Sequence, residues 1–422
     1  MKVNFVTQPY DGVLPPNQNS IGLIVYNTAL AMARDAQVTL YAKRRREAPP
    51  AADVPFRMSY VAAPTDELMQ TVAGRYPRWA RMLRLDALAD AHPGYARAVR
   101  SRLDHDSPDI VHVMNYWGWS RQLRDNRGNG SRRRRLVLEM QSEWLSQMDM
   151  RAVDEQLQAV DGIVAVSDHI ARLVRTALPN YRGMVATAWN GVDVDIFQPA
   201  VQREPESGRA PSLLFVGRAS PEKGVHTLLE AFALVVRRFG NARLDIAGPR
   251  TILPSRFLVE LSSDPLVRAL MRFYDGSTSS DYQRHLDELV VRLGLQQNVR
   301  FLGAIPHKQL VSAYQSADVV VNPSLSESFG ISMVEAMACA VPAIGTKVGG
   351  MLETVVDRET GRLVDADQPE ALAAAIIDVL SDPSDARRMG VNGRARAEQH
   401  FSWRARARSL LETYRQLLDR AN

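Results

Sequence analysis

Short apolar runs alternate with amphipathic segments along most of the chain. Continuous apolar runs predict buried strands, and apolar residues spaced three and four apart predict helices. In the first half, a helix is predicted at 21–34, and strands are predicted at 3–7, 36–42, 109–113, 136–140, 162–166 and 185–189. Strands that alternate with helices are typical of an open parallel sheet covered on both faces.

The second half repeats the alternation after a polar stretch at 199–211, rich in proline and glycine, which predicts an interdomain linker. Strands are predicted at 212–216, 243–247, 299–302, 319–322, 342–345 and 361–364, and helices at 225–239, 331–338, 369–380 and 385–400. We therefore predict an α/β protein of two doubly wound, Rossmann-like domains, 1–198 and 199–402. A last helix at 403–418, within the tail 403–422, could pack back on the first domain. Such domains bind ligands at the carboxyl ends of their strands, here in a crevice between two facing sheets.

Composition narrows the class of protein. With 422 residues, 45% apolar and 23% charged, the chain has the length and composition of two globular domains rather than of a disordered protein. It has no apolar run long enough to span a membrane, and its first residues lack the layout of a signal peptide. The single cysteine, Cys339, lies in an apolar helical pattern, where we expect it to pack. It cannot form an internal disulfide, which favours a reducing cytoplasm.

The net charge is +5, so the protein is modestly basic. Nearly all of its basic residues are arginines, because the 52 basic residues include only five lysines. This skew is as consistent with codon bias as with selection for polyanion binding, and we expect no nucleic-acid partner. Two basic runs, 43–46 and 132–135, are interpreted as solvated loops. Contact with anionic lipid headgroups or with an acidic acceptor is the alternative.

The most informative segment is 323–342, which follows the predicted strand 319–322. A polar loop carries Glu327, a glycine (Gly330) lies at the mouth of the next helix, and Glu335 lies about one turn inside that helix. Free amides and the helix dipole at such a mouth favour an anion or a cluster of hydroxyl groups. Two carboxylates placed around it could hold two different hydroxyl groups of one elongated ligand, although two solvated carboxylates flanking a loop is the simpler alternative.

This segment resembles the Glu-x7-Glu motif of family 4 retaining glycosyltransferases, which have the GT-B fold. The resemblance rests on P-S-x-x-E-x-F-G-x-x-x-x-E-A-M-A, followed by Pro342 and by Gly349-Gly350. It implies that Glu327 holds hydroxyl groups of a donor sugar and that Glu335 holds the nucleotide ribose. The backbone amides implied to assist Glu327 belong to Phe329, Gly330 and Ile331.

A second segment agrees with this family. A predicted strand ends at Gly217, the following loop carries Arg218 and Lys223, and a helix begins after Gly224. Two cations beside a helix mouth suit a diphosphate. The segment is similar to the V-G-R-x-x-x-E-K-G stretch of family 4, which implies that Arg218 and Lys223 neutralise the donor diphosphate. The alternative is two cations on an exposed turn.

Asn190-Gly-Val-Asp193 matches the family's passage from the first to the second domain. Asp193-Val-Asp195 mimics a D-x-D metal signature, but here it belongs to that connector, and we predict no metal site. We interpret Asp-His-Asp at 104–106 as polar side chains on the surface. The long connection 249–295, with a helix-like part at 258–271 and a polar part at 276–281, could shape a pocket edge or an oligomer interface.

The first domain departs from the family pattern in two places. Ser20-Ile21-Gly22 stands where members usually carry a glycine pair beside the donor phosphate, and Gln141 stands where they commonly carry a histidine. The resemblance still places Gly22 and Gln141 at the donor. Glutamine cannot titrate, so a proton shuttle at this position is in doubt. Four aromatic residues near strand ends could contact the acceptor or simply pack: Tyr116, Trp117, Trp119 and Trp144.

The resemblance implies a retaining, metal-independent hexosyltransferase. Its donor would be a nucleotide diphosphate sugar of the UDP type, bound by 199–402, and its acceptor a hydroxyl-bearing small molecule, glycan or lipid-linked compound, bound over 1–198. No cofactor is expected. We expect a cytoplasmic protein, leave contact with a membrane surface open, and leave the oligomeric state undecided. A nucleotide-sugar epimerase or hydrolase on the same fold, and a catalytically silent sugar-nucleotide binder, remain alternatives.

Overall fold

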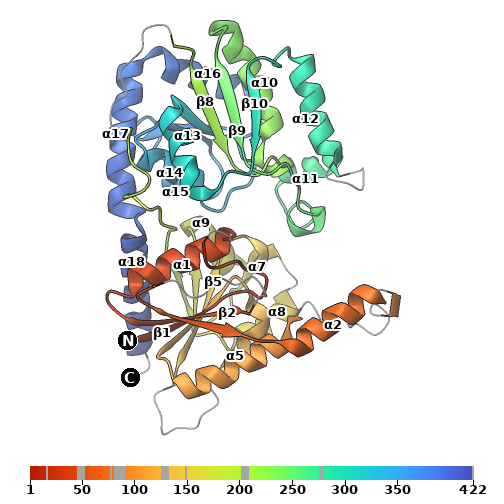
Figure 1. Cartoon of the computed structure of the whole chain (residues 1–422), viewed down its shortest axis with the longest axis vertical. Coiled ribbons are helices and arrows are strands. Elements are labelled where there is room, and N and C mark those ends of the chain that lie inside the picture. The colour runs from red at the N-terminus through yellow and green to blue at the C-terminus, as the bar shows by residue number, and fades with distance from the viewer. Residues whose placement is uncertain are drawn as a thin grey trace. The chain divides into compact units, whose positions relative to one another are not determined.

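The computed structural model describes residues 1–15, 18–44, 53–76, 78–79, 91–124, 133–147, 150–200, 209–274 and 280–420. They form two compact units (Figure 1). The first unit comprises Met1–Val166, Ile170–Ala188 and Trp403–Asn422, and the second comprises Ser167–His169 and Trp189–Ser402. The division at Ala188/Trp189 precedes the predicted boundary at 198/199, so the Asn190–Asp193 turn lies in the second unit. Most of the predicted linker, at 201–208, lies outside the described residues.

The first unit is built on a seven-stranded parallel sheet in the order β3-β2-β1-β4-β5-β6-β7. Strands buried on both faces are apolar along their length, which is why the chain reads as apolar runs. The strands are β1 (Lys2–Val6), β2 (Gln37–Lys43), β3 (Arg57–Val61), β4 (Ile110–Met114), β5 (Arg135–Met140), β6 (Gly162–Ala165) and β7 (Met184–Thr187).

The helices of this unit include the last helix of the chain, α18 (Trp403–Asp419), which packs beside α1 (Ser20–Met32) (Figure 1). Apolar side chains of both helices share a core with the strands, among them Ile24, Leu410 and Val137. The remaining helical elements are α2 (Pro64–Arg75), α5 (Pro93–Asp106), η1 (Trp117–Trp119), α6 (Ser120–Leu123), α7 (Trp144–Gln147), α8 (Met150–Leu157) and α9 (Asp168–Ala177).

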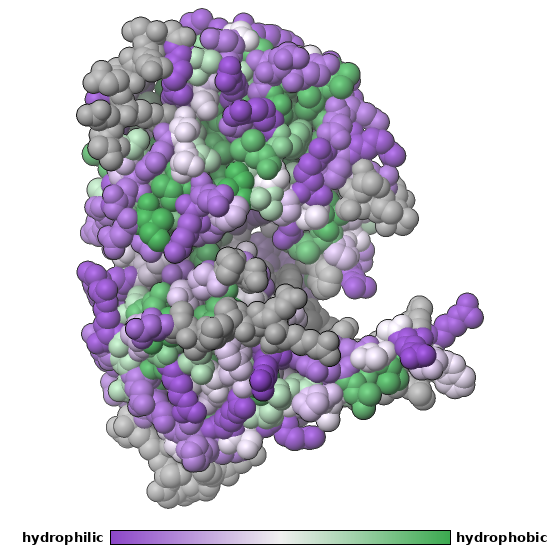
Figure 2. Space-filling view, in the orientation of Figure 1, coloured by the Kyte–Doolittle hydropathy of each residue, from purple (hydrophilic) through white to green (hydrophobic). Residues whose placement is uncertain are grey.

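Several elements of this unit were not predicted, among them β3, α2 and α5. β3 lies at the edge of the sheet, and its sequence, Arg-Met-Ser-Tyr-Val, mixes polar and apolar residues because only part of it is buried. α2 has few buried positions and leaves apolar side chains such as Leu68 exposed, so its sequence lacks a clear apolar face. Over this part of the molecule, Figure 2 shows hydrophobic and hydrophilic residues side by side on the surface. The start of α5 is capped by a residue that is distant in the sequence. The Asp66 carboxylate, in α2, accepts hydrogen bonds from the amides of Gly94 and Tyr95, at 2.7 and 2.8 Å.

The second unit has a six-stranded parallel sheet in the order β10-β9-β8-β11-β12-β13. The strands are β8 (Ser212–Val216), β9 (Arg243–Ala247), β10 (Val299–Gly303), β11 (Val319–Asn322), β12 (Ala343–Thr346) and β13 (Gly361–Val364). Its main α-helices are α10 (Val225–Arg238), α12 (Ser280–Arg292), α13 (Leu310–Ser316), α14 (Ile331–Ala338), α15 (Met351–Thr354), α16 (Pro369–Ser381) and α17 (Pro383–His400). α10 and α16 pack together on the core that holds Phe215, Phe232 and Ile376.

The helix-like part predicted at 258–271 is not one continuous helix. The structure has three short helical elements in this region: η3 (Ser255–Phe257), α11 (Pro265–Ala269) and η4 (Leu270–Phe273). Pro265 has no amide hydrogen to continue a helix, and Asp264 begins a new one by accepting a hydrogen bond from the Leu266 amide at 2.8 Å. Most of the polar part predicted at 276–281 lies outside the described residues, which omit 275–279.

The structure also bears on the two predictions about membrane-spanning segments and the single cysteine. Among the described residues, no helix is long and apolar enough to cross a membrane. Cys339, at the end of α14, is buried, and burial raises the pKa of its thiol to about 12.

Candidate active site

In the second unit, the two predicted motifs meet where β8 and β11 end. Gly224, between the first loop and α10, has a φ of +66°, and a Cβ there would lie 2.1 Å from the carbonyl oxygen of Pro323. Only glycine permits this approach. The Leu325 amide also donates a hydrogen bond to the Glu222 carbonyl, at 2.8 Å. The loop that carries Lys223 is therefore packed backbone to backbone against the loop that carries Glu327.

The side chains of these loops form an ion pair. Lys223 Nζ lies 2.8 Å from Glu327 Oε2, and both side chains are largely buried. Asn322 Nδ2 and the Phe329 amide lie 3.5 and 3.4 Å from the same carboxylate. Burial by itself would raise the pKa of Glu327, but the charge and hydrogen bond of Lys223 outweigh it, so the pKa is lowered. Glu327 is thus held as a carboxylate.

Arg218 lies in the same loop, directly after Gly217, whose amide donates to the Ala247 carbonyl at 2.9 Å. Its guanidinium is 3.7 Å from the buried carboxylate of Glu222, and about one third of the side chain is exposed. Glu222 is itself fixed, because Ser220 Oγ donates to it at 2.6 Å. Arg218 and Lys223 thus place two cations on one loop, each held by a carboxylate.

The loop before α14 is shaped by glycines. Gly330 has a φ of +87° and caps the first turn of the helix, a backbone conformation that other residues rarely adopt. A Cβ on Gly349 would lie 1.9 Å from the Glu327 carbonyl oxygen, and one on Gly350 would lie 2.2 Å from that of Ser328. The glycine pair therefore lets the chain after β12 pack against the backbone of the Glu327 loop. Ile331 begins α14, and Phe329 is buried beside Phe401.

Glu335 lies one turn inside α14, as predicted, but its surroundings were not predicted. The residue is 3% exposed, and both of its carboxylate oxygens have protein partners. His307 Nε2 lies 2.6 Å from Oε1, and the Tyr314 hydroxyl donates to Oε2 at 2.6 Å. Burial alone would lower the pKa of His307, but the hydrogen bond and charge of Glu335 raise it.

Sequence reasoning missed His307 and Tyr314. His307 follows shortly after the carboxyl end of β10, where polar side chains of such folds commonly meet ligands, and this position is the signal that could have found it. Its side chain remains about one third exposed. Tyr314 is fully buried in α13 and gave no such signal.

The remaining predicted donor residues lie in the first unit. Gly22 is in the first turn of α1, where a Cβ would meet the Gly12 carbonyl oxygen at 1.7 Å, so glycine lets the preceding loop lie across the helix. Its amide donates to the N-cap side chain of Asn19, at 2.8 Å. Gln141 follows the end of β5, and its side-chain amide donates to the carboxylate of Glu139.

The aromatic residues divide between the two alternatives. Trp119 is 1% exposed, donates from Nε1 to the Ala91 carbonyl at 2.8 Å, and contacts the ring of Tyr95, so it packs in the first unit. Tyr116 lies against it, with ring centroids 4.4 Å apart. Tyr116 and Trp117 are only partly buried and stay candidates for acceptor contact. Trp144 begins α7, and its side chain lies outside the described part of the structure.

The other polar groups have structural partners. Asp193 Oδ1 accepts from the amides of Asp195 and Ile196, both at 3.1 Å, which fixes the connector turn. Asp104 pairs with Arg100 and Arg134. Within the described ranges, no group of three or more histidine, cysteine or acidic side chains is arranged to hold a metal ion.

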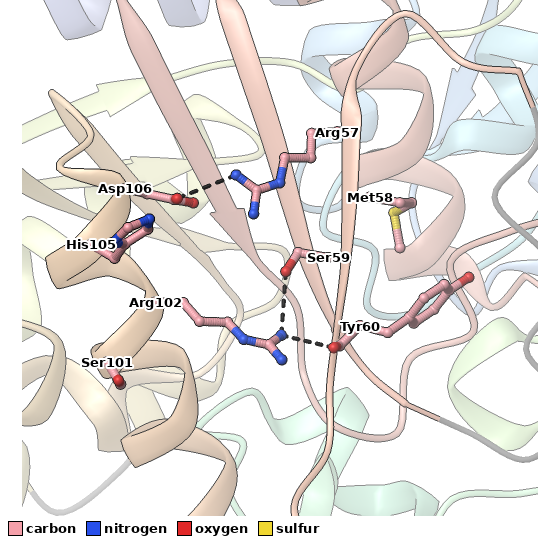
Figure 3. Close-up of a pocket in the computed structure, with 8 residues that line it drawn as sticks. All are labelled: Arg57, Met58, Ser59, Tyr60, Ser101, Arg102, His105 and Asp106. Carbon is pink, nitrogen blue, oxygen red and sulfur yellow. Dashed lines mark hydrogen bonds and ion pairs between the residues drawn. The ribbon is translucent and has the colours of Figure 1, made fainter.

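A pocket of about 460 Å³ lies between β3 and α5 (Figure 3). It contains none of the predicted site residues. Its cations are already engaged: Arg57 pairs with Asp106 at 3.2 Å, and Arg102 donates to Ser59 Oγ and to the Tyr60 carbonyl (Figure 3). The arginines here bind the edge strand and the end of α5 together.

Comparisons with known proteins agree with the two motifs. The family described as glycosyl transferases group 1 matches residues 198–396, and the family described as Glycosyltransferase Family 4 matches residues 21–196. A D-inositol 3-phosphate glycosyltransferase of Corynebacterium urealyticum is 31% identical over 281 residues, covering 64% of this chain and 60% of the relative. One of the same description from Segniliparus rotundus is 36% identical over 233 residues, covering 54% and 46%. The chain thus matches about half to three fifths of the length of these curated relatives.

Solved structures show the same fold. Sucrose-phosphate synthase from Thermosynechococcus elongatus has a TM-score of 0.70 at 23% identity, covering 100% of both chains. Anabaena HepE in complex with UDP-glucose has a TM-score of 0.63 at 19% identity, covering 99% of this chain and 100% of the other. With both sheets parallel and doubly wound, the fold is that of the GT-B class. The chain therefore belongs to the glycosyltransferase families described as group 1 and Family 4.

Proposed function

We propose that this glycosyltransferase transfers a hexose from a nucleotide diphosphate to an acceptor hydroxyl, with retention of the anomeric configuration. The observation that supports it most is the convergence of Arg218, Lys223 and Glu327 where β8 and β11 end. Two cations suit a diphosphate, and an ionised carboxylate beside the mouth of a helix suits sugar hydroxyls. A nucleotide diphosphate sugar carries both a diphosphate and sugar hydroxyls. Lys223 and Glu327, the residues proposed to bind these two groups, lie 2.8 Å apart.

In this scheme the leaving diphosphate is stabilised by side chains of the second unit. Negative charge grows on the bridging oxygen as the bond to the anomeric carbon breaks, and Arg218 and Lys223 would oppose that charge most strongly in the transition state. No metal is needed for this step, and the nucleotide sugar is a substrate rather than a cofactor. The departing diphosphate would accept the proton of the acceptor hydroxyl, so no titrating side chain is required at Gln141.

Glu327 would accept hydrogen bonds from hydroxyls of the donor sugar, assisted by the amides at 329–331. Glu335 would hold the ribose. His307 and Tyr314 each occupy one of its oxygens, but a carboxylate oxygen has more than one acceptor site. We infer that these two residues fix the Glu335 carboxylate in place, and that ribose hydroxyls would donate to acceptor sites that remain.

The family resemblance also assigns residues of the first unit to the substrates. Gln141 would orient the donor sugar by hydrogen bonding, and the backbone around Gly22 would lie beside the phosphate of the donor. Tyr116 and Trp117 are the aromatic candidates for acceptor contact. The proposed donor is a UDP-hexose, in keeping with the UDP-glucose bound by Anabaena HepE. The proposed acceptor is a hydroxyl-bearing small molecule, glycan or lipid-linked compound, and the inositol phosphate named in the curated relatives makes cyclitol phosphates the first to test.

The test starts from the purified protein and a panel of nucleotide sugars. Thermal unfolding should shift upward with one donor, because a ligand that binds only the folded state stabilises it. That donor is then incubated with candidate acceptors, and the anomeric configuration of the product is read by NMR. A retained configuration is expected. Inversion would refute the retaining mechanism, release of free hexose without any acceptor would favour a hydrolase, and the absence of any nucleotide-sugar shift would overturn the proposal.

A further inference from the structure

A cluster of polar side chains is buried in the apolar layer of the first unit, beneath α18. We call it the Glu139 cluster: Thr28, His112, Glu139, Arg406 and Tyr414. All five are at most 2% exposed. They come from α1, β4, β5 and α18, and apolar core residues such as Val137 and Leu410 surround them.

Arg406 and Glu139 are the charged pair of this cluster. Arg406 donates to Glu139 Oε1 at 2.6 Å, to Thr28 Oγ1 at 2.9 Å and to the Ala188 carbonyl at 2.7 Å. His112 Nε2 lies 2.8 Å from Glu139 Oε2, and its Nδ1 lies 2.6 Å from the Tyr414 hydroxyl. Burial would raise the pKa of Glu139, but Arg406 and His112 together lower it to about 2. Glu139 is therefore a buried, ionised carboxylate.

Stability alone does not explain this arrangement. Removing two charges from water carries a large desolvation cost, and apolar residues of similar volume often stabilise a fold as well as a buried ion pair does, or better. Many of the residues that share this layer with the pair are apolar. The polar pair therefore needs another explanation.

The cluster contacts one residue of the proposed site. Glu139 lies near the end of β5, and Gln141 directly follows that strand, two positions further along the chain. Gln141 Nε2 donates to Glu139 Oε1, the oxygen that also accepts from Arg406. The Gln141 amide donates to Asn115 Oδ1 at 3.2 Å, and the Asn115 amide donates to the Glu139 carbonyl at 2.8 Å. Gln141 is thus held by its side chain and by its backbone.

We propose that Glu139 and Arg406 are positioning residues for Gln141. Glu139 accepts a hydrogen bond from the side-chain amide of Gln141, which fixes the orientation of the Gln141 side chain. Arg406, in the last helix of the chain, holds the Glu139 carboxylate in place. This inference rests on the proposed function, in which Gln141 orients the donor sugar. It gives α18 a role in the reaction although α18 contributes no residue to the proposed site.

The test replaces the pair by apolar residues of similar length, Glu139→Met with Arg406→Met, so that no unpaired charge is left behind. The double variant should unfold at a higher temperature than either single variant. Its turnover should fall roughly threefold to tenfold, the worth of one hydrogen bond. Binding of UDP, which the proposed function assigns to the second unit, should be unchanged.

The same pair of substitutions is then made in a Gln141→Ala background. If the cluster acts through Gln141, the pair should cost less than about twofold more there. Equal losses in both backgrounds, or unchanged turnover in the first, would overturn the proposal. Arg134→Met is the matched control, since Arg134 is equally buried in this unit, pairs with Asp104 at 2.8 Å and has no bond to the cluster among the described contacts. It should lower stability without lowering turnover.

A crystal structure of the double variant separates this proposal from the proposed function. Gln141 should leave its position when Glu139 no longer accepts from it. If Gln141 keeps its position, positioning by Glu139 is refuted whatever the protein catalyses. If Gln141 moves but the unaltered protein transfers no sugar from any nucleotide sugar, the positioning stands and the proposed function fails.

Discussion

Replacing Lys223 by methionine removes the cation that holds Glu327 while keeping most of the volume of the side chain. Glu327 is left largely buried without its ion-pair partner, since its side chain is only 15% exposed. Breaking a fully buried pair costs about 3–5 kcal/mol. Lys223 is 24% exposed, so solvent screens part of the interaction and we expect a loss of about 1–3 kcal/mol at pH 7.

The loss should depend on pH in a defined direction. In the unaltered protein the pKa of Glu327 is lowered, so its contribution to stability is present above the unfolded pKa and is lost as the pH falls through the folded pKa. Without Lys223, burial dominates and should raise that pKa, which destabilises the variant at neutral pH and less so once Glu327 is protonated. The difference in melting temperature should therefore shrink between pH 7 and about pH 4.

Thermal unfolding across this pH range measures the effect, and Lys223→Met with Glu327→Gln should recover most of the stability. Turnover of Lys223→Met should fall by about tenfold to a hundredfold, because a charge-assisted contact contributes about 1.5–3 kcal/mol. Affinity for the nucleoside diphosphate should fall less, since the charge on the leaving group grows in the transition state. A stability difference that is independent of pH, or unchanged turnover, would refute the reasoning.

Four other predictions follow from the site. Calorimetry should find that Glu335→Ala weakens binding of the free nucleoside diphosphate, whereas Glu327→Ala leaves it nearly intact while turnover collapses; the reverse would exchange the two roles. Because the pKa of His307 is raised in the folded protein, its contribution to stability is present below about pH 6.5 and is lost as the pH rises through the folded pKa. His307→Gln should therefore lower the melting temperature more at pH 6 than at pH 9, and an equal effect at both would contradict the assignment. Transfer should survive EDTA, and a loss restored by Mg²⁺ or Mn²⁺ would argue for a metal. Gln141→Ala should slow transfer roughly threefold to tenfold, and Gln141→His should stay active without a new titration near pH 6.5; an inactive alanine variant would mean that this position takes part in the chemistry.

Local pattern was sufficient for the second sheet. β8, β9, β11 and β13 have the predicted bounds, and α14 begins at Ile331 as predicted. β8 and β11 are buried along most of their length, so each reads as a short apolar run by itself. The edge strand β3 escaped prediction because part of it is solvated, and the false helix at 258–271 arose because an apolar pattern hid the start of a new turn at Pro265.

The sequence by itself also identified the candidate donor residues, because Arg218, Lys223, Glu327 and Glu335 lie in local motifs with fixed spacing. Only the tertiary structure decided what holds them. Lys223 meets Glu327 across 104 positions, and His307 meets Glu335 across 28.

The first unit shows the same limit more strongly. Arg406 and Glu139 are 267 positions apart, and no local pattern links a polar residue at the end of β5 to an arginine in the last helix. Periodicity and motif spacing report which residues share a face or a loop. The partner of a buried charge is chosen by which elements the fold packs together, and by the cost of leaving that charge without a partner.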